Sequence, residues 1–182
     1  LKNTPRLLSG LTEAATKNAF SFYSSFAENI VTVSTPEVAE MAKLFENTFR
    51  QVNIALVNEM AIICNSFNLN VYEVLNAADT KPYGFMKFNP GPGVGGHCIP
   101  VDPTYLAYSA GIKGASARFI ELANKVNLDM PAYIIERCKK LVGNLSGKKI
   151  LICGVAYKSN ISDTRETPAS SLFDQLIRDN AE

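Results

Sequence analysis

The residue best suited to covalent chemistry is Cys98, which closes a glycine-rich segment. Residues 89–103 read Asn-Pro-Gly-Pro-Gly-Val-Gly-Gly-His-Cys-Ile-Pro-Val-Asp-Pro. A thiol at the end of such a loop is placed to act as a nucleophile, and the glycines leave backbone N–H groups free to approach a phosphate or a sugar hydroxyl. A structural cysteine is the competing interpretation, and position alone favours the nucleophile only slightly.

Two polar neighbours of Cys98 have structural as well as chemical interpretations. His97 is adjacent in sequence, and because adjacent side chains often point apart, a structural role is favoured over that of a base. Asp102 precedes Pro103, a pair that is typical of a helix N-cap. Asp102 also follows Cys98 by four residues, close enough to act on the same site. The two roles of Asp102 are compatible.

The other cysteines indicate neither a metal site nor a disulfide scaffold. Cys64 and Cys153 lie inside apolar runs and are expected to be buried core thiols. With Cys138 they are widely spaced, and the chain has one histidine, so a zinc site is not expected. The cysteine usage suits a reducing compartment, and we expect a cytoplasmic protein.

The glycine spacing in the loop matches a dinucleotide-binding pattern by letters alone. Gly91, Gly93 and Gly96 fit G-x-G-x-x-G. That fingerprint requires a strand before it and a helix that opens within it. Here Asn-Pro precedes and Ile-Pro follows, so we reject a dinucleotide site in this loop.

A long helix is the strongest structural prediction. Thr35 is placed to cap it, Pro36 suits its first position, and apolar residues recur at helical spacing as far as Ile63. A helix of about thirty residues is too long to be covered by its neighbours in this chain. We therefore expect a domain spine that also serves as a subunit interface.

A stripe of polar residues crosses this helix. Lys43 and Asn47 are four residues apart, so they share one face, and the row continues toward Arg50 and Gln51. From spacing alone, the stripe is interpreted as a solvated face.

Composition places the chain among ordinary globular proteins. Its 182 residues are 47% hydrophobic and 19% charged, with a net charge of +1. Such a small charge gives no electrostatic basis for binding nucleic acid or an anionic membrane. The longest apolar stretch, 54–63, is too short to span a bilayer. The chain begins with Leu1 and stops at the end of a predicted helix, so we expect a fragment of a longer protein.

The remaining elements follow from capping residues and apolar runs. The run 149–155 ends in glycine and valine, as a buried parallel strand entering a loop does. The other predicted elements are a helix at 12–26, a strand at 30–33, and helices after Asn70, from Asp102, around 115–127, at 129–142 and after Thr167.

Three segments resemble one enzyme family in order and spacing. Residues 40–59 resemble the central helix of the UDP-glucose/GDP-mannose dehydrogenase family, the nucleotide-sugar 6-dehydrogenases. Residues 95–103 resemble its nucleophile loop, and residues 154–168 resemble the opening of its C-terminal nucleotide-sugar domain. The resemblance covers essentially the whole chain.

The family resemblance implies a fold with three parts. Residues 1–35 would end the N-terminal cofactor domain. Residues 36–145 would form a mainly α central dimerisation domain with the spine helix and the nucleophile loop. Residues 146–182 would begin a Rossmann-like α/β C-terminal domain with its first β-α unit. The rest of both outer domains is not in this sequence, so we expect the chain alone to be inactive but able to form a homodimer.

The resemblance also implies a chemistry. The family uses NAD to oxidise C6 of a nucleotide sugar twice, from alcohol through aldehyde to carboxylate. Cys98 would attack the aldehyde and pass through a thioester. Lys43 and Asn47 match the residues that stabilise developing charge at O6, and Asp102 matches the acid–base aspartate.

Binding residues carry over in the same way. Arg165 matches an arginine that approaches the cofactor. The residues that match the family's contacts to the nucleotide sugar are Asn89, Pro90, Gly91, Gly93, Gly95 and Lys158.

The sugar and two other function classes are left open by the sequence. Residues 81–85, Lys-Pro-Tyr-Gly-Phe, stand where many UDP-glucose enzymes carry an arginine, which favours a UDP-N-acetylhexosamine over UDP-glucose. One alternative keeps Cys98 as the nucleophile of a transferase without NAD. The other is a helical dimerisation module in which every polar residue is structural. A role in surface polysaccharide assembly is what the resemblance implies.

Overall fold

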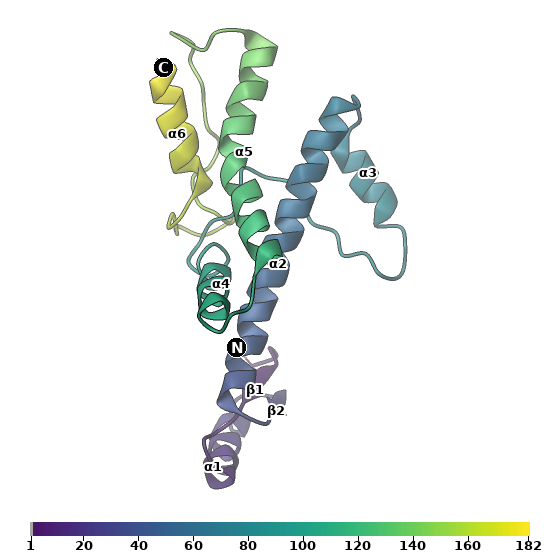
Figure 1. Ribbon diagram of the computed structural model, residues 1–182, viewed down its shortest axis with the longest axis vertical. Helices are drawn as coiled ribbons and strands as arrows, with labels where there is room; N and C mark the ends of the chain where they lie inside the picture. Colours follow the sequence, from purple (N-terminus) through teal and green to yellow (C-terminus); the bar gives the residue numbers. More distant parts are fainter. Residues whose placement is uncertain (1) are drawn as a thin grey trace. The chain divides into compact units, whose positions relative to one another are not determined.

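The computed structural model describes residues 2–182, which form a mostly helical fold (Figure 1). The chain divides into two compact units, one ending at Glu46 and one running from Asn47 to Glu182. The elements are β1 (Arg6–Leu8), α1 (Glu13–Ser24), β2 (Ile30–Thr32), α2 (Pro36–Ser66), α3 (Val71–Ala78), α4 (Asp102–Ile112), α5 (Arg118–Val142) and α6 (Pro168–Arg178).

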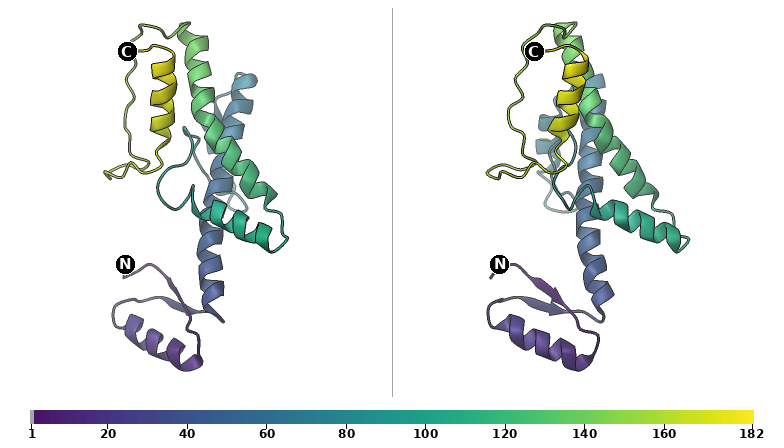
Figure 2. Two further views of the ribbon diagram at one scale, coloured as in Figure 1. Left: turned by 60° about the vertical axis from the view of Figure 1, so that its left-hand side comes forward. Right: turned by 90° about the vertical axis from the view of Figure 1, so that its left-hand side faces the viewer.

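The first unit contains a small β-α-β arrangement. Strands β1 and β2 pair in parallel, with Arg6 opposite Ile30, and α1 forms the crossover that parallel strands require (Figure 2). Thr12 caps α1 by accepting a hydrogen bond from the N–H of Ala15 at 3.1 Å. The helix and β2 agree with the sequence prediction, whereas the three-residue β1 is too short to carry a periodic signal.

Helix α2 is the predicted spine. It begins at Pro36, and the N–H of Val38 donates to the hydroxyl of Thr35 at 3.4 Å. Its 31 residues correspond to about 46 Å of helix. It ends where Asn68 adopts a left-handed conformation and the N–H of Leu69 reaches back to the carbonyl of Cys64 at 2.8 Å.

Helix α5 is continuous where the sequence predicts two separate helices. Pro131 lies inside it and has no N–H to give to the carbonyl of Asn127, four residues earlier. The helix nevertheless continues and buries Ala123, Met130 and Ile135. Burial of these side chains on both sides of the proline offsets the one lost hydrogen bond.

The core of the second unit lies between α5 and α6, which run side by side in both figures. Ile135, Leu145, Leu172 and Leu176 form one buried cluster, and Leu145 is fully enclosed. Helix α6 begins, as the sequence predicts, at a Thr167 cap that accepts from the N–H of Ala169.

The segment 149–155 is not a strand in the described part of the chain, contrary to the sequence prediction. Leu151 is 85% exposed, and Cys153 is exposed rather than a core thiol. A β-strand forms only where a neighbouring segment shares its backbone hydrogen bonds. Here only one of the described residues, Glu182, pairs with the segment. Ile150 N–H donates to the Glu182 carbonyl and Glu182 N–H to the Lys148 carbonyl, both at 2.8 Å, which is the alternation of a parallel ladder.

Among residues 2–182, no helix combines the length and the apolar character that crossing a membrane requires.

Candidate active site

The glycine-rich loop, residues 89–98, is held against two neighbouring segments. A Cβ at Gly93 would lie 2.8 Å from the carbonyl oxygen of Asn127, and one at Gly96 would lie 2.8 Å from the ring of Tyr157. Both glycines also have positive φ, +131° and +85°. Side chains are therefore excluded at these two positions by space and by backbone conformation.

Two backbone N–H groups of this loop already have partners within the chain. Gly91 N–H donates to Oδ1 of Asn58 at 2.8 Å, and Gly96 N–H donates to the carbonyl of Arg165 at 2.9 Å. The sequence suggested that the loop amides were free for a ligand. At these two glycines they instead hold the loop in place.

Cys98 is exposed at the end of this loop. Its carbonyl accepts hydrogen bonds from the N–H groups of Asp102, at 2.8 Å, and Val101, at 3.3 Å. These bonds close one helical turn that leads directly into α4. The thiol and the carboxyl group therefore belong to a single turn of backbone.

Asp102 is bonded to the spine helix. Nδ2 of Asn47 donates to Oδ2 of Asp102 at 2.5 Å, and Asn47 is only 1% exposed. Asp102 does not cap its helix, contrary to the sequence prediction. It is the first residue of α4 itself, and Val101 occupies the cap position without a side-chain bond.

Hydrogen bonds at both its oxygen and its nitrogen determine the orientation of the Asn47 amide. The guanidinium of Arg50 donates to Oδ1 of Asn47, while Nδ2 faces Asp102. Because an amide nitrogen carries two hydrogens, one N–H of Asn47 remains beyond the one given to Asp102.

The interpretation of the polar stripe as a solvated face is wrong for Asn47 and Gln51. They are 1% and 0% exposed. Both side-chain polar atoms of Gln51 are buried without a hydrogen-bond partner among the described residues. Lys43 belongs to the first unit, is exposed, and lies 3.1 Å from the carboxylate of Glu46.

Arg165, whose carbonyl accepts from Gly96 of the loop, forms an ion pair with Asp163. Arg165 donates two side-chain bonds to Asp163, from Nη2 at 2.6 Å and from Nε at 2.9 Å. These side-chain bonds, with the backbone N–H of Arg165, lower the pKa of Asp163 from 3.8 to about 2. Asp163 in turn raises the pKa of Arg165, with a smaller electrostatic contribution from the nearby Cys98.

The structure brings most of the predicted site residues of the second unit to one place. Cys98, Asp102 and Asn47 are linked by the hydrogen bonds above, and the loop glycines lie in the segment that leads to Cys98. Arg165 joins them through its carbonyl. Asn89 and Lys158 are exposed, and Lys158 directly follows Tyr157, whose ring covers Gly96.

Two hollows border the loop. One of about 190 Å³ is lined by Gly93, Asn127 and residues 166–168 among others. The other, of about 330 Å³, is lined by Pro90, Gly91 and side chains of α5. Positions that the family resemblance assigns to substrate binding therefore face open space.

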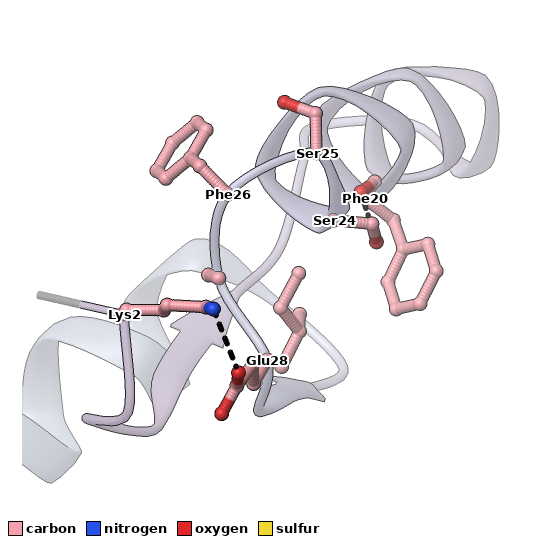
Figure 3. A pocket seen from close by; sticks show the side chains of 8 residues that line it. Lys2, Phe20, Ser24, Ser25, Phe26 and Glu28 are labelled. Carbon is pink, nitrogen blue, oxygen red and sulfur yellow. Dashed lines mark hydrogen bonds and ion pairs between the residues drawn. The ribbon is translucent and has the colours of Figure 1, made fainter.

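A further hollow lies in the first unit, and none of the residues that line it is predicted to do chemistry. It has a volume of about 370 Å³. Figure 3 shows Lys2 facing Glu28, an exposed ion pair of 3.2 Å, beside the rings of Phe20 and Phe26. An exposed pair with aromatic neighbours is ordinary surface chemistry.

Asn58 and Asn127 were not recognised as site residues from the sequence. Both are buried, at 0% and 3% exposure, and both contact the loop. The available signal was Asn58 itself, a polar residue that interrupts the apolar run 54–63. Within residues 2–182, no group of three or more His, Cys, Asp or Glu is arranged to hold a metal ion.

The profile of the UDP-glucose/GDP-mannose dehydrogenase family, central domain, matches residues 37–129, just over half of the chain. The chain belongs to this family. A UDP-N-acetyl-D-mannosamine dehydrogenase from Methanococcus maripaludis is 38% identical over 100% of the chain and 42% of the relative. An NDP-N-acetyl-D-galactosaminuronic acid dehydrogenase from Ralstonia nicotianae is 36% identical over 98% of the chain and 41% of the relative.

Solved structures agree with the family assignment. The UDP-D-ManNAc dehydrogenase of Pyrococcus horikoshii has a TM-score of 0.86 and 36% identity, covering 98% of this chain and 43% of that one. The chain thus spans about two fifths of the length of the relatives that it matches. The fold of this chain, including its long helix α2, is therefore similar to that of a solved UDP-sugar dehydrogenase.

Proposed function

We propose that the polypeptide containing this chain oxidises C6 of a UDP-linked sugar to the carboxylate, with Cys98 as the nucleophile. The observation that carries the proposal is the turn from Cys98 to Asp102, in which an exposed thiol is followed by a carboxyl group bonded to the buried Asn47. Sulfur and carboxyl group share one rigid turn beside an amide donor, as covalent capture of an aldehyde requires.

In the proposed reaction, the second oxidation proceeds through a covalent bond to the Cys98 thiol. The alcohol at C6 first loses a hydride and a proton to become the aldehyde. The sulfur of Cys98 then adds to the aldehyde carbon, and O6 takes up a proton to complete the thiohemiacetal. Loss of the second hydride and of that proton leaves a thioester. Water attacks the thioester carbon, the C–S bond breaks, and the uronate and the thiol are released.

In these reaction steps, residues of this chain would stabilise developing charge and transfer protons. The second N–H of Asn47 would stabilise negative charge on O6, and the family resemblance assigns Lys43 the addition of a positive charge there. The Asp102 carboxylate takes a proton from the attacking water. Its bond to Asn47 would hold the carboxylate beside the reacting carbon.

NAD+ is the hydride acceptor that this chemistry requires. The guanidinium of Arg165 fits a role in holding it, since its side chain is 65% exposed behind the loop that carries Cys98. Arg165 is bonded to Asp163 and its side chain remains largely exposed, so an anionic phosphate could bind it without burying an unpaired charge.

A UDP-N-acetylhexosamine is the favoured substrate, with UDP-glucose next. The relatives above are named for N-acetylated sugars, and this chain lacks the upstream arginine typical of UDP-glucose enzymes. The residues proposed to line the nucleotide-sugar pocket are Asn89, Pro90, Gly91, Gly93, Gly95 and Lys158.

The second candidate, a helical dimerisation module, is favoured for the isolated chain by α2. Its side chains of Leu56 and Ile63 are 57% and 40% exposed, although apolar residues at such spacing are normally covered. We propose that a second copy covers them in a homodimer. The chain alone would then dimerise without catalysis, and the complete cytoplasmic enzyme would need the cofactor domain.

The test is the stoichiometry of the complete polypeptide. We expect two NADH per sugar consumed with UDP-N-acetyl-D-mannosamine, less activity with UDP-glucose, and loss of the second NADH in Cys98→Ala. A Cys153→Ala variant is the matched control, because Cys153 is also exposed. No NADH with any of these sugars, or full activity in Cys98→Ala, would remove Cys98 from catalysis. Acylation of Cys98 without NAD would favour the transferase.

A further inference from the structure

A chain of side-chain amides connects the spine helix, α5 and the glycine-rich loop. The N–H of Gly91 donates to Oδ1 of Asn58 at 2.8 Å. Nδ2 of Asn58 donates to Oδ1 of Asn127 at 2.9 Å. Nδ2 of Asn127 donates to the backbone carbonyl of Gln51 at 3.2 Å. Both asparagines are buried, so the bonds are formed away from solvent.

The donor-to-acceptor direction of this series of hydrogen bonds is determined by its two ends. At one end a backbone N–H of Gly91 can only donate, and at the other a backbone carbonyl of Gln51 can only accept. Each amide between them must therefore accept through oxygen and donate through nitrogen. Rotating either amide by half a turn would place oxygen against oxygen or N–H against N–H. Only this orientation satisfies every bond.

The backbone carbonyl of Asn127 also packs directly against the loop. Pro131 leaves the Asn127 carbonyl without its helical donor, and Gly93 passes so close that a Cβ there would lie 2.8 Å from that oxygen. The proline that fails to end α5 thus frees the carbonyl against which the loop packs. One residue of α5 contacts the loop at Gly91, through Asn58, and at Gly93.

We infer that Asn127 and Asn58 are positioning residues that set the glycine-rich loop, and with it Cys98, through this one-way chain of amide bonds. The inference rests on the proposed function, in which Cys98 is the nucleophile. The loop is held at Gly91 and Gly93 by the two asparagines and at Gly96 by the Arg165 carbonyl. Cys98 follows the last of these anchors by two residues.

Asn127→Asp is the discriminating variant because it preserves the shape of the side chain and replaces the N–H donor with a carboxylate oxygen. A carboxylate at this position still accepts from Asn58 but repels the Gln51 carbonyl. Protonation restores an O–H donor, so the effect should be reversed at low pH. Asn124→Asp, one turn earlier on α5 and only half buried, makes the same chemical change outside the amide chain and is the matched control.

The first readout is hydrogen exchange of the Gly91 amide in the chain, referenced to the amides of α6. In Asn127→Asp at neutral pH we expect Gly91 to exchange at least ~5-fold faster relative to that reference, with protection regained as the pH is lowered. Equal exchange in Asn127→Asp and Asn124→Asp would overturn the inference. If Asn127→Asp does not fold, Asn58→Leu breaks the amide chain at Gly91 and at Asn127 without burying a charge.

The second readout is the stoichiometry of the complete polypeptide. Misplacing Cys98 should lower the yield below two NADH per sugar, whereas mere loss of folded protein lowers the rate and leaves the stoichiometry at two. A yield of two in Asn127→Asp and Asn58→Leu would overturn the positioning role. A wild-type yield other than two would instead contradict the proposed function, while Gly91 exchange would still test the amide chain.

Discussion

The amide nitrogen of Asn47 lies 2.5 Å from Oδ2 of Asp102, a residue 55 positions later in the chain. This bond joins the buried face of the spine helix to the first turn of α4. The N–H of Asp102 in turn donates to the carbonyl of Cys98, at 2.8 Å. The position of the thiol is therefore tied to the spine helix through one side-chain hydrogen bond.

Asn47→Ala should lower kcat of the complete enzyme by about 100-fold. The substitution removes both the donor to Asp102 and the donor proposed for O6. The measurement is steady-state NADH formation at saturating sugar. Asn65→Ala is the control, since Asn65 lies on the same helix and is exposed. Equal kcat values for the two variants would exclude Asn47 from the reaction.

Arg165→Gln should raise the pKa of Asp163 from about 2 toward its ordinary 3.8. Because the folded-state pKa is depressed, the stability that this pair contributes is fully present above pH ~4 and is lost as the pH falls through about 2. The stability difference between wild type and variant should therefore vanish on acidification. An NMR titration of the Asp163 carboxyl group measures the shift. The same titration in Arg178→Gln, an exposed change on α6, should leave Asp163 unaltered.

Gly96→Ala should lower the free energy of unfolding by about 2 kcal/mol. The new Cβ would lie 2.8 Å from the Tyr157 ring, and φ of +85° is unfavourable for alanine. Gly111→Ala offers a contrast, because nothing lies within 4 Å of its Cβ position and the residue is inside α4. That change should raise stability by roughly 0.5–1 kcal/mol. Urea denaturation of the chain compares the two, and similar effects of both would contradict the close packing at Gly96.

Gln51→Met should raise the free energy of unfolding by about 1 kcal/mol. The Gln51 side chain is fully buried, and neither of its polar atoms has a partner among the described residues. An unbranched apolar side chain of similar length removes the cost of burying them. Gln175→Met is the comparison, since Gln175 donates to Ser171 at 3.2 Å, and it should not stabilise the chain. A loss of stability in Gln51→Met would show that the amide has a bound partner in solution.

Leu56→Glu should convert a dimer of the chain into a monomer. Leu56 is 57% exposed on α2, and a carboxylate there would be buried without a partner in the proposed interface. Sedimentation equilibrium gives the mass of each species. Leu128→Glu places the same charge on exposed α5 and should leave the dimer intact. A wild-type chain that sediments as a monomer would reject the interface.

The helix boundaries were determined largely by the sequence itself. Thr12, Thr35, Asn70 and Thr167 each accept a hydrogen bond from the N–H two or three residues later. Such caps involve only neighbouring residues, so a local pattern is sufficient to predict them. The family, too, could be recognised from three short motifs, because they lie in one order along the chain.

Tertiary structure alone decided what is buried and what is paired. Pro131 indicates a helix end by local rules, but packing on both of its sides keeps α5 continuous. Residues 149–155 have the pattern of a strand, yet a strand forms only where a partner supplies its hydrogen bonds. Asn47 and Gln51 have the spacing of a solvated stripe, yet both side chains are buried. Asp102 of α4 accepts from the side chain of Asn47, and Asn127 of α5 donates to the backbone carbonyl of Gln51. Helical periodicity specifies a face of the helix, and only the contacts with distant segments specify what covers that face.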